Sequence, residues 1–208
     1  MNILDLIKKH KIIPLGTLIT DEEVENICNC LTKADLPIIE VTLRDKRVID
    51  ILKEFKNYSN ISLGVGTIRS KDQIDLAIEA EASFAITPGF SYKLSEYALE
   101  SGLTLIPGIQ TASEVMAASE AGHKTLKFFP AELSGGVDRL NAFKSVFSDI
   151  TFIPTGGITN KNITNYLSLD NVVAAGASSA MPESLIRSKS WQEIINNLEE
   201  IKTIIKAI

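Results

Sequence analysis

The chain has 208 residues, of which 45% are hydrophobic, and a formal net charge of −5. This length can bury one substantial core, and no linker rich in Pro, Gly or Ser divides it, so we expect a single domain over residues 1–208. The charge includes no basic cluster, which argues against a nucleic-acid partner and favours a small-molecule substrate. No apolar run approaches the length of a membrane span, so we expect no membrane partner and a cytoplasmic location.

The cysteines and histidines give no indication of a metal site. Cys28 and Cys30 lie two residues apart in a segment of helical period, so their side chains point to different faces and do not share a metal. His10 and His123 are far apart, and neither shows the spacing of metal ligands. We therefore expect no metal, and two reduced thiols in the packing.

Short apolar runs alternate along the chain with segments of helical period. Eight runs have the composition of buried strands: Ile12-Ile13, Pro37 to Val41, Ile61 to Val65, Phe84 to Thr87, Thr104 to Ile106, Thr125 to Phe128, Phe152 to Thr155 and Val172 to Ala175. Helical spacing of apolar residues fills the gaps and continues from Trp191 to Ile205. Several helix starts have capping-box spacing: Thr20 with Glu23, Ser70 with Gln73, and Thr111 with Glu114.

This alternation predicts an α/β fold, a single-domain (β/α)8 TIM barrel with short loops. The alternative, an open doubly wound sheet, usually carries a glycine-rich fingerprint after its first strand, and Pro14-Leu15-Gly16-Thr17 does not match one. Residues Ile3 to His10 predict an extra N-terminal helix that could plug the bottom of the barrel. Functional residues of such barrels lie at the C-terminal ends of the strands.

Lys127 lies in the middle of the apolar run Thr125-Leu126-Lys127-Phe128-Phe129-Pro130. Lysines are almost never fully buried without a reason, because an unpaired ammonium is costly to remove from water. Desolvation favours the neutral amine, which is a nucleophile toward carbonyls, so a Schiff base is the leading hypothesis. The alternative is an edge-strand lysine whose stem covers apolar surface while its head reaches water.

Glu40 is the second candidate for the chemistry. In Ile38-Ile39-Glu40-Val41 the period of two turns Ile39 and Val41 toward the helices and Glu40 into the barrel, where Lys127 also points. A carboxylate beside the amine could move the protons that Schiff-base chemistry requires. The alternative is a structural ion pair between Glu40 and Lys127 or Arg44.

Other strand ends carry groups suited to a substrate. The guanidinium of Arg44 matches a carboxylate such as that of a 2-keto acid, although a solvated loop arginine is the alternative. Thr67 and Thr87-Pro88 follow the next two strands and could line the same pocket.

Two small-residue motifs follow the last two strands. Thr155-Gly156-Gly157-Ile158-Thr159 and Gly176-Ala177-Ser178-Ser179 resemble the phosphate site of barrels, in which bare backbone N–H groups face an anion. Either motif alone could be a tight turn, but their joint position favours a phosphate site.

With these residues assembled, the chain resembles the class I 2-keto-3-deoxy-6-phosphogluconate aldolases, which also act as 4-hydroxy-2-oxoglutarate aldolases. The matching stretches cover nearly the whole chain: Ile39 to Arg44, Gly64 to Thr67, Phe84 to Gly89, Ile106 to Gly108, Leu126 to Glu132, Pro154 to Ile158 and Gly176 to Ser178. The run Lys-Phe-Phe-Pro-Ala-Glu is highly specific, whereas Gly-Gly-Ile is shared by many phosphate-binding barrels.

The resemblance implies a lyase that needs no cofactor, in which Lys127 forms the Schiff base and Glu40 is the general acid/base. It implies that Arg44, Thr67 and Pro88 contact the pyruvyl portion of a 2-keto acid. It also implies phosphate binding by Gly156, Gly157, Ala177 and Ser178, and a homotrimer.

The chain departs from the family's pattern in the distal pocket. Many relatives carry an arginine where this chain has Leu15-Gly16-Thr17-Leu18, and an aromatic residue often follows the serine that here precedes Ser179-Ala180. Substrate preference therefore stays open. Two rival functions also remain: a metal-free phosphosugar isomerase or phosphate-dependent synthase, and a non-catalytic phosphometabolite sensor with a silent ion pair.

Overall fold

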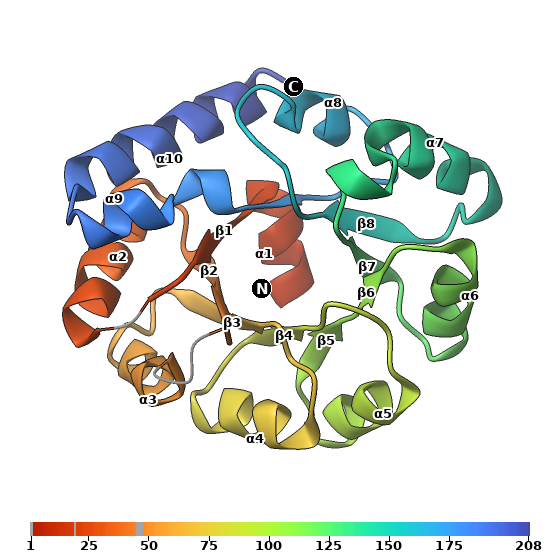
Figure 1. Cartoon of the computed structure of the whole chain (residues 1–208), viewed down its shortest axis with the longest axis horizontal. Helices are drawn as coiled ribbons and strands as arrows, with labels where there is room; N and C mark the ends of the chain where they lie inside the picture. Colours follow the sequence, from red (N-terminus) through yellow and green to blue (C-terminus); the bar gives the residue numbers. More distant parts are fainter. Residues whose placement is uncertain (1, 19, 45–47) are drawn as a thin grey trace.

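The computed structural model describes residues 2–18, 20–44 and 48–208. It is an α/β fold in which a curled parallel sheet is surrounded by helices (Figure 1). The strands are β1 (Ile12–Gly16), β2 (Ile38–Thr42), β3 (Ser62–Gly66), β4 (Phe84–Ile86), β5 (Thr104–Ile106), β6 (Gly108–Ile109), β7 (Thr125–Phe128), β8 (Thr151–Pro154) and β9 (Ala175–Ala177). The helices are α1 (Ile3–His10), α2 (Asp21–Lys33), α3 (Val48–Leu52), α4 (Lys71–Glu79), α5 (Tyr92–Glu100), α6 (Ala112–Glu120), α7 (Gly136–Val146), α8 (Ile163–Leu167), α9 (Glu183–Arg187) and α10 (Trp191–Lys206).

The strand pairings follow the chain around the curl. Six strands pair in the order β5-β4-β3-β2-β1-β9 and three in the order β6-β7-β8. Pro107 alone separates β5 from β6, and its carbonyl accepts a hydrogen bond from Lys127 N at 2.9 Å. Isolated bridges join Phe152 to Val172 and Thr155 to Gly176. The two groups of strands are therefore connected at both junctions: through Pro107 between β5 and β6, and through the two bridges between the β8 segment and the β9 segment.

The final strand lies later in the chain than the sequence pattern predicts. Val172 makes only an isolated bridge to Phe152, whereas Ala175 to Ala177 pair continuously with Ile12 to Pro14. Gly176 has neighbours on both sides, Ile13 of β1 and, through an isolated bridge, Thr155 after β8. The regular strand therefore starts at Ala175, the last residue of the predicted Val172 to Ala175 run.

Helix starts agree closely with the capping signals. Both reciprocal hydrogen bonds of a capping box are present at Thr20 with Glu23 and at Thr111 with Glu114. At α4, Ser70 accepts from Gln73 N, but the Gln73 side chain accepts from Arg69 N instead of completing the box. The short helix α9 has no counterpart in the sequence prediction, because five residues contain too little periodicity to identify it.

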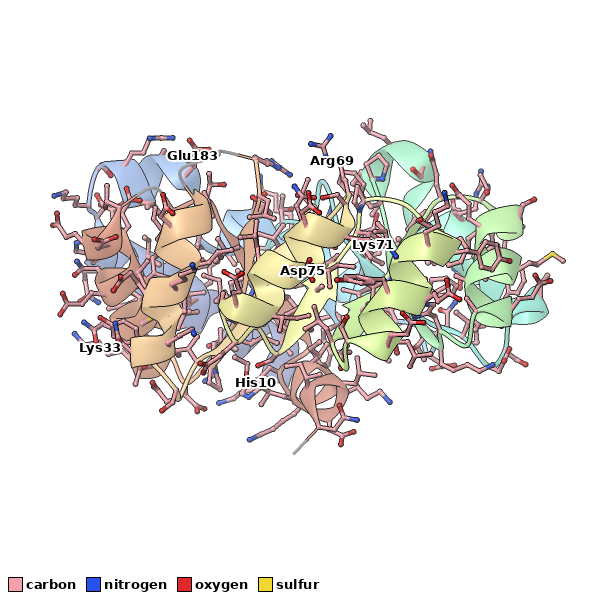
Figure 2. All side chains as sticks on the ribbon, turned by 90° about the horizontal axis from the view of Figure 1, so that it is seen from below. His10, Lys33, Arg69, Lys71, Asp75 and Glu183 are labelled. Atoms are coloured by element: carbon pink, nitrogen blue, oxygen red, sulfur yellow. The ribbon has the colours of Figure 1, made fainter. Side chains whose placement is uncertain are left out.

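Two apolar cores lie on opposite faces of the sheet. Ile39, Val41, Leu126 and Phe128 belong to the large core between the strands and the outer helices. The smaller core lies inside the curl and combines Ile7 of α1 with Ile13, Ile38, Phe84, Ile86, Ile106, Ile153 and Ala174. Figure 2 shows α1, marked by His10, at the end opposite Arg69 and Glu183. The interior at that other end is left to polar residues.

Candidate active site

Lys127 and Glu40 form a buried ion pair inside the curled sheet. Lys127 lies on β7 and Glu40 on β2, and Lys127 Nζ is 3.3 Å from Glu40 Oε1. Only 7% of the lysine side chain and 1% of the glutamate side chain are exposed. Lys127 Nζ also lies 5.2 Å from the centroid of the Phe129 ring. The amine is thus kept almost dry beside one carboxylate and one aromatic face.

The strand alternation places these two side chains together, as the sequence predicts. Leu126 and Phe128 face the outer core, so Lys127 between them must face the interior. The same argument applies to Glu40 between Ile39 and Val41. Gly66 on β3 completes the arrangement, because a Cβ there would lie 2.0 Å from Glu40 Oε1.

A cavity of about 460 Å³ opens at the C-terminal ends of the strands. Its lining includes Thr42, two residues after Glu40, and Phe129, two residues after Lys127. The ion pair is not part of the lining and lies one step deeper along the same two strands. A ligand in the cavity would therefore approach the Lys127 amine from the C-terminal ends of the strands.

The predicted substrate residues divide into two groups. Arg44, Thr155, Gly156, Gly157 and Ser178 line the cavity. Thr67, Pro88 and Ala177 do not line it, in the part of the chain that the structure describes.

Thr67 and Pro88 are half-buried after β3 and β4, and Ala177 is buried in β9. Thr67 has a φ of +65°, a left-handed conformation that is uncommon for a threonine. The two loops that carry Thr67 and Pro88 lie across the interior from the cavity's β8 and β9 wall.

The Gly156-Gly157 turn is fixed by contacts with the segment after β7. Both glycines have positive φ angles, +99° and +82°, which suit residues without a Cβ. Ala131 N donates to Thr155 O at 2.8 Å and Glu132 N to Gly156 O at 3.2 Å. A Cβ at Gly157 would lie 2.4 Å from Glu132 Cγ, so the turn packs directly on that side chain.

Tyr166 of α8 fixes the side chain of Glu132 through a hydrogen bond. Its hydroxyl donates to Glu132 Oε1, and the ring is fully buried. Burial, followed by the hydrogen bond to Glu132, raises the pKa of the Tyr166 phenol above its usual value. The phenol therefore stays protonated as a donor, and one buried residue anchors the support of the glycine turn.

Some lining residues were not among the sequence candidates. Thr42, Phe129 and Glu183 line the cavity, and Glu183 also pairs with Arg187, whose Nη2 lies 2.6 Å from Glu183 Oε1. The period of two from Glu40 and Lys127 could have identified Thr42 and Phe129. No sequence signal identifies Glu183, which depends on the short helix α9.

Among residues 2–18, 20–44 and 48–208, no group of three or more His, Cys, Asp or Glu side chains could hold a metal ion. Over the same residues, none of the helices combines the length and apolar character needed to cross a membrane.

Comparison with known proteins identifies the family. Residues 3–197 match the family model described as KDPG and KHG aldolase, in which KDPG stands for 2-keto-3-deoxy-6-phosphogluconate and KHG for 4-hydroxy-2-oxoglutarate. The chain is 32% identical over 190 residues to the 2-dehydro-3-deoxy-phosphogluconate aldolase of Pseudomonas aeruginosa, covering 91% of this chain and 86% of that protein. It is 35% identical over 184 residues to the KHG/KDPG aldolase of Escherichia coli K12, covering 88% and 86%.

A solved structure shows the same likeness. The KDPG aldolase of Legionella pneumophila, with pyruvate captured as a covalent carbinolamine intermediate, superposes with a TM-score of 0.92 at 32% identity, covering 95% of this chain and 97% of that one. Sequence and structure agree over nearly the whole length. The chain belongs to the KDPG and KHG aldolase family.

Proposed function

We propose that this chain is a class I aldolase, a lyase that forms a Schiff base between Lys127 and the keto group of its substrate. The substrates are 2-keto-3-deoxy-6-phosphogluconate, cleaved to pyruvate and glyceraldehyde 3-phosphate, and/or 4-hydroxy-2-oxoglutarate, cleaved to pyruvate and glyoxylate. The observation that carries the proposal is the buried Lys127 amine 3.3 Å from Glu40 Oε1 beneath an open cavity. Family membership supports the same reaction.

The reaction begins when Glu40 accepts a proton from the Lys127 ammonium with which it is paired, and the resulting neutral amine attacks the C2 keto carbon to form a carbinolamine. Glu40 then returns this proton to the carbinolamine hydroxyl, which leaves as water. Loss of water gives an iminium, which is an electron sink. Glu40 then removes the proton of the C4 hydroxyl while the C3–C4 electron pair moves toward the iminium, releasing the aldehyde and leaving an enamine. Protonation at C3 and hydrolysis give pyruvate and regenerate the amine. No metal or organic cofactor is required by these steps.

The substrate is held at its two ends. Arg44, Thr67 and Pro88, which follow β2, β3 and β4, bind the pyruvyl portion. Thr155, Gly156, Gly157, Ala177 and Ser178 bind the distal portion and its phosphate, when one is present. The positive φ angles at Gly156 and Gly157, and the position of both glycines on the cavity wall, support an anion site formed by backbone N–H groups.

We also infer the finer architecture and assembly. The two isolated bridges beside β9 and the continuity from β5 through Pro107 to β6 support a closed (β/α)8 barrel in one domain, residues 1–208, with α1 across its bottom. We propose a homotrimer on the resemblance of the sequence to the aldolase family. The free, buried thiols of Cys28 and Cys30 are consistent with a cytoplasmic protein.

Borohydride reduction in the presence of pyruvate tests the proposal. Mass spectrometry should find one reduced pyruvyl adduct on the peptide that contains Lys127, and Lys127→Ala should abolish it. Lys124→Ala is the matched control. Lys124 lies three positions before Lys127, but it is exposed and pairs with Asp149. Labelling that persists in Lys127→Ala would assign the Schiff base elsewhere, and no labelling of the wild type would exclude a class I aldolase.

A further inference from the structure

Thr42 has a buried hydroxyl that lacks a hydrogen-bond partner among the described residues. The residue is 3% exposed, and its Oγ1 is one of the buried side-chain atoms without a partner. Buried polar atoms in proteins are normally hydrogen-bonded, so an orphaned hydroxyl beside a cavity points to a partner that is supplied by a ligand. Thr42 lines the cavity above Lys127.

Glu40 has a second orphaned oxygen on the same strand face. Its Oε1 is paired with Lys127 Nζ, whereas its Oε2 is buried and unpartnered over the described residues. Glu40 and Thr42 are separated by two positions on β2, so both side chains point into the interior. Two unpartnered oxygen atoms, Glu40 Oε2 and Thr42 Oγ1, therefore lie one after the other on the path from the ion pair to the cavity.

The position of the cavity indicates which part of a substrate meets Thr42. Its walls come from β1, β2, β7, β8 and β9 and the segments after them, and not from the loops of Thr67 and Pro88. Of the three residues proposed to bind the pyruvyl portion, Arg44 lines this cavity, whereas Thr67 and Pro88 do not. With the pyruvyl portion held between Arg44 and those two loops, the rest of the cavity holds the portion beyond C3. The first polar group beyond C3 is the C4 hydroxyl.

We infer that the Thr42 hydroxyl donates a hydrogen bond to the C4 oxygen of the bound substrate and fixes the configuration accepted at C4. This inference rests on the proposed aldolase function and adds a residue to it. Glu40 Oε2 takes the C4 hydroxyl proton, the C3–C4 pair enters the iminium, and the C4–O bond becomes the carbonyl of the aldehyde. Thr42 neither gains nor loses a proton; its O–H holds the same oxygen before and after cleavage.

Thr42→Val tests this role, because valine keeps the shape of threonine and removes the hydroxyl. Borohydride trapping of pyruvate and deuterium exchange at the pyruvate methyl group should stay near wild-type levels, since neither reaction involves a C4 oxygen. Cleavage of 4-hydroxy-2-oxoglutarate should slow about tenfold or more in kcat. In the synthetic direction, the ratio of the two C4 enantiomers of 4-hydroxy-2-oxoglutarate formed from pyruvate and glyoxylate should move toward unity.

Two further variants separate this role from a structural one. Thr42→Ser retains the hydroxyl and should restore most of the cleavage rate and the enantiomer ratio. Thr125→Val makes the same change at the start of β7, where Thr125 Oγ1 lies 3.1 Å from Thr151 Oγ1, and should leave the enantiomer ratio unchanged.

The outcomes distinguish this inference from the proposed function. Wild-type cleavage and an unchanged enantiomer ratio in Thr42→Val would overturn the role of Thr42, while persistent trapping would leave the aldolase intact. Equal losses of trapping, exchange and cleavage, or a serine variant as impaired as the valine variant, would also overturn it. If pyruvate and borohydride fail to label the wild-type protein, the proposed aldolase function itself is wrong.

Discussion

Gly66 leaves the space that the carboxylate of Glu40 occupies. A Cβ on Gly66 would lie 2.0 Å from Glu40 Oε1 and 2.8 Å from its Cδ, far inside any tolerable contact. The two residues lie on neighbouring strands, with Glu40 paired in register to Gly64. The side chain of Glu40 therefore leans along the sheet over Gly66, toward Lys127.

Gly66→Ala should displace Glu40 from Lys127 and reduce kcat by about 10² or more, because misplacing a proton-transfer group has effects of this size. The measurement is steady-state cleavage together with a thermal melt. Gly89→Ala is the matched control, since a Cβ there would meet nothing within 4 Å. Equal activity in both variants would show that the position of the carboxylate does not limit the reaction.

Glu40→Gln should keep the shape of the side chain and remove its capacity to take a proton. We expect pyruvate trapping at Lys127 to continue and turnover to fall by about 10² to 10⁴. Trapping in the variant also reports that the protein is folded around Lys127. A turnover rate near that of the wild type would exclude Glu40 from proton transfer and favour a structural pair.

Ser178→Ala should weaken phosphorylated substrates more than 4-hydroxy-2-oxoglutarate. Ser178 lines the cavity beside the Gly156-Gly157 turn, and a hydrogen bond to a charged group contributes about 1.5–3 kcal/mol, so KM for the phosphorylated substrate should rise about tenfold or more. KM values for both substrates are compared in the same preparation. An equal loss for the two would argue against a phosphate at this position.

Tyr166→Phe should loosen the support beneath the glycine turn. The variant removes the donor to Glu132 Oε1 from a fully buried ring, and we expect unfolding in urea to need about 1–2 kcal/mol less free energy. KM for a phosphorylated substrate should rise while trapping by pyruvate stays. Tyr97→Phe, which removes an exposed hydrogen bond to Asp75, should change stability by less.

Two histidines, the buried His10 and the half-buried His123, predict a loss of stability in mild acid. Burial lowers the pKa of His123, and burial followed by the nearby Lys9 charge lowers that of His10. Because the unfolded chain binds these protons near the ordinary value of 6.5, stability is fully present above that pH and declines as the pH falls below it.

Thermal melts between pH 7.5 and pH 5 check this expectation. His123→Gln removes one of the two titrations, so its melting temperature should fall less steeply with acid than that of the wild type. Parallel slopes in the two proteins would show that His123 does not contribute. Asp149→Asn is the control, because the hydrogen bond from Lys124 lowers the pKa of this exposed carboxyl, so it does not titrate in this range and the slope should stay that of the wild type.

Residues with strictly local determinants could be predicted from the sequence. The inward direction of Glu40 and Lys127 follows from the period of two along a strand, and the Thr20 and Thr111 caps follow from side chains three residues apart. The polar residues after Thr155 and Gly176 were expected at one end of the sheet, and Gly156, Gly157 and Ser178 line one cavity there.

Features that depend on distant packing could not be predicted. The contact of Gly66 with Glu40 depends on how two neighbouring strands are placed relative to each other. The hydrogen bond from Tyr166 to Glu132 joins residues 34 positions apart. The late start of β9 depends on the register of its ladder with β1, in which Ala175 lies opposite Ile12, a residue far away in the chain. Gln73 bonds to Arg69 N because that donor is also within reach, which spacing alone does not reveal.

The helix α1 lies at the end of the fold remote from the cavity, with Ile7 buried among residues such as Ile13 and Ile38 of the inner core (Figure 2). The proposed catalytic residues and α1 thus lie at opposite ends of the molecule. An engineer who wants heat resistance could redesign α1 without touching the chemistry. Immobilisation through the outer side of this helix would likewise leave the mouth of the cavity facing the solution.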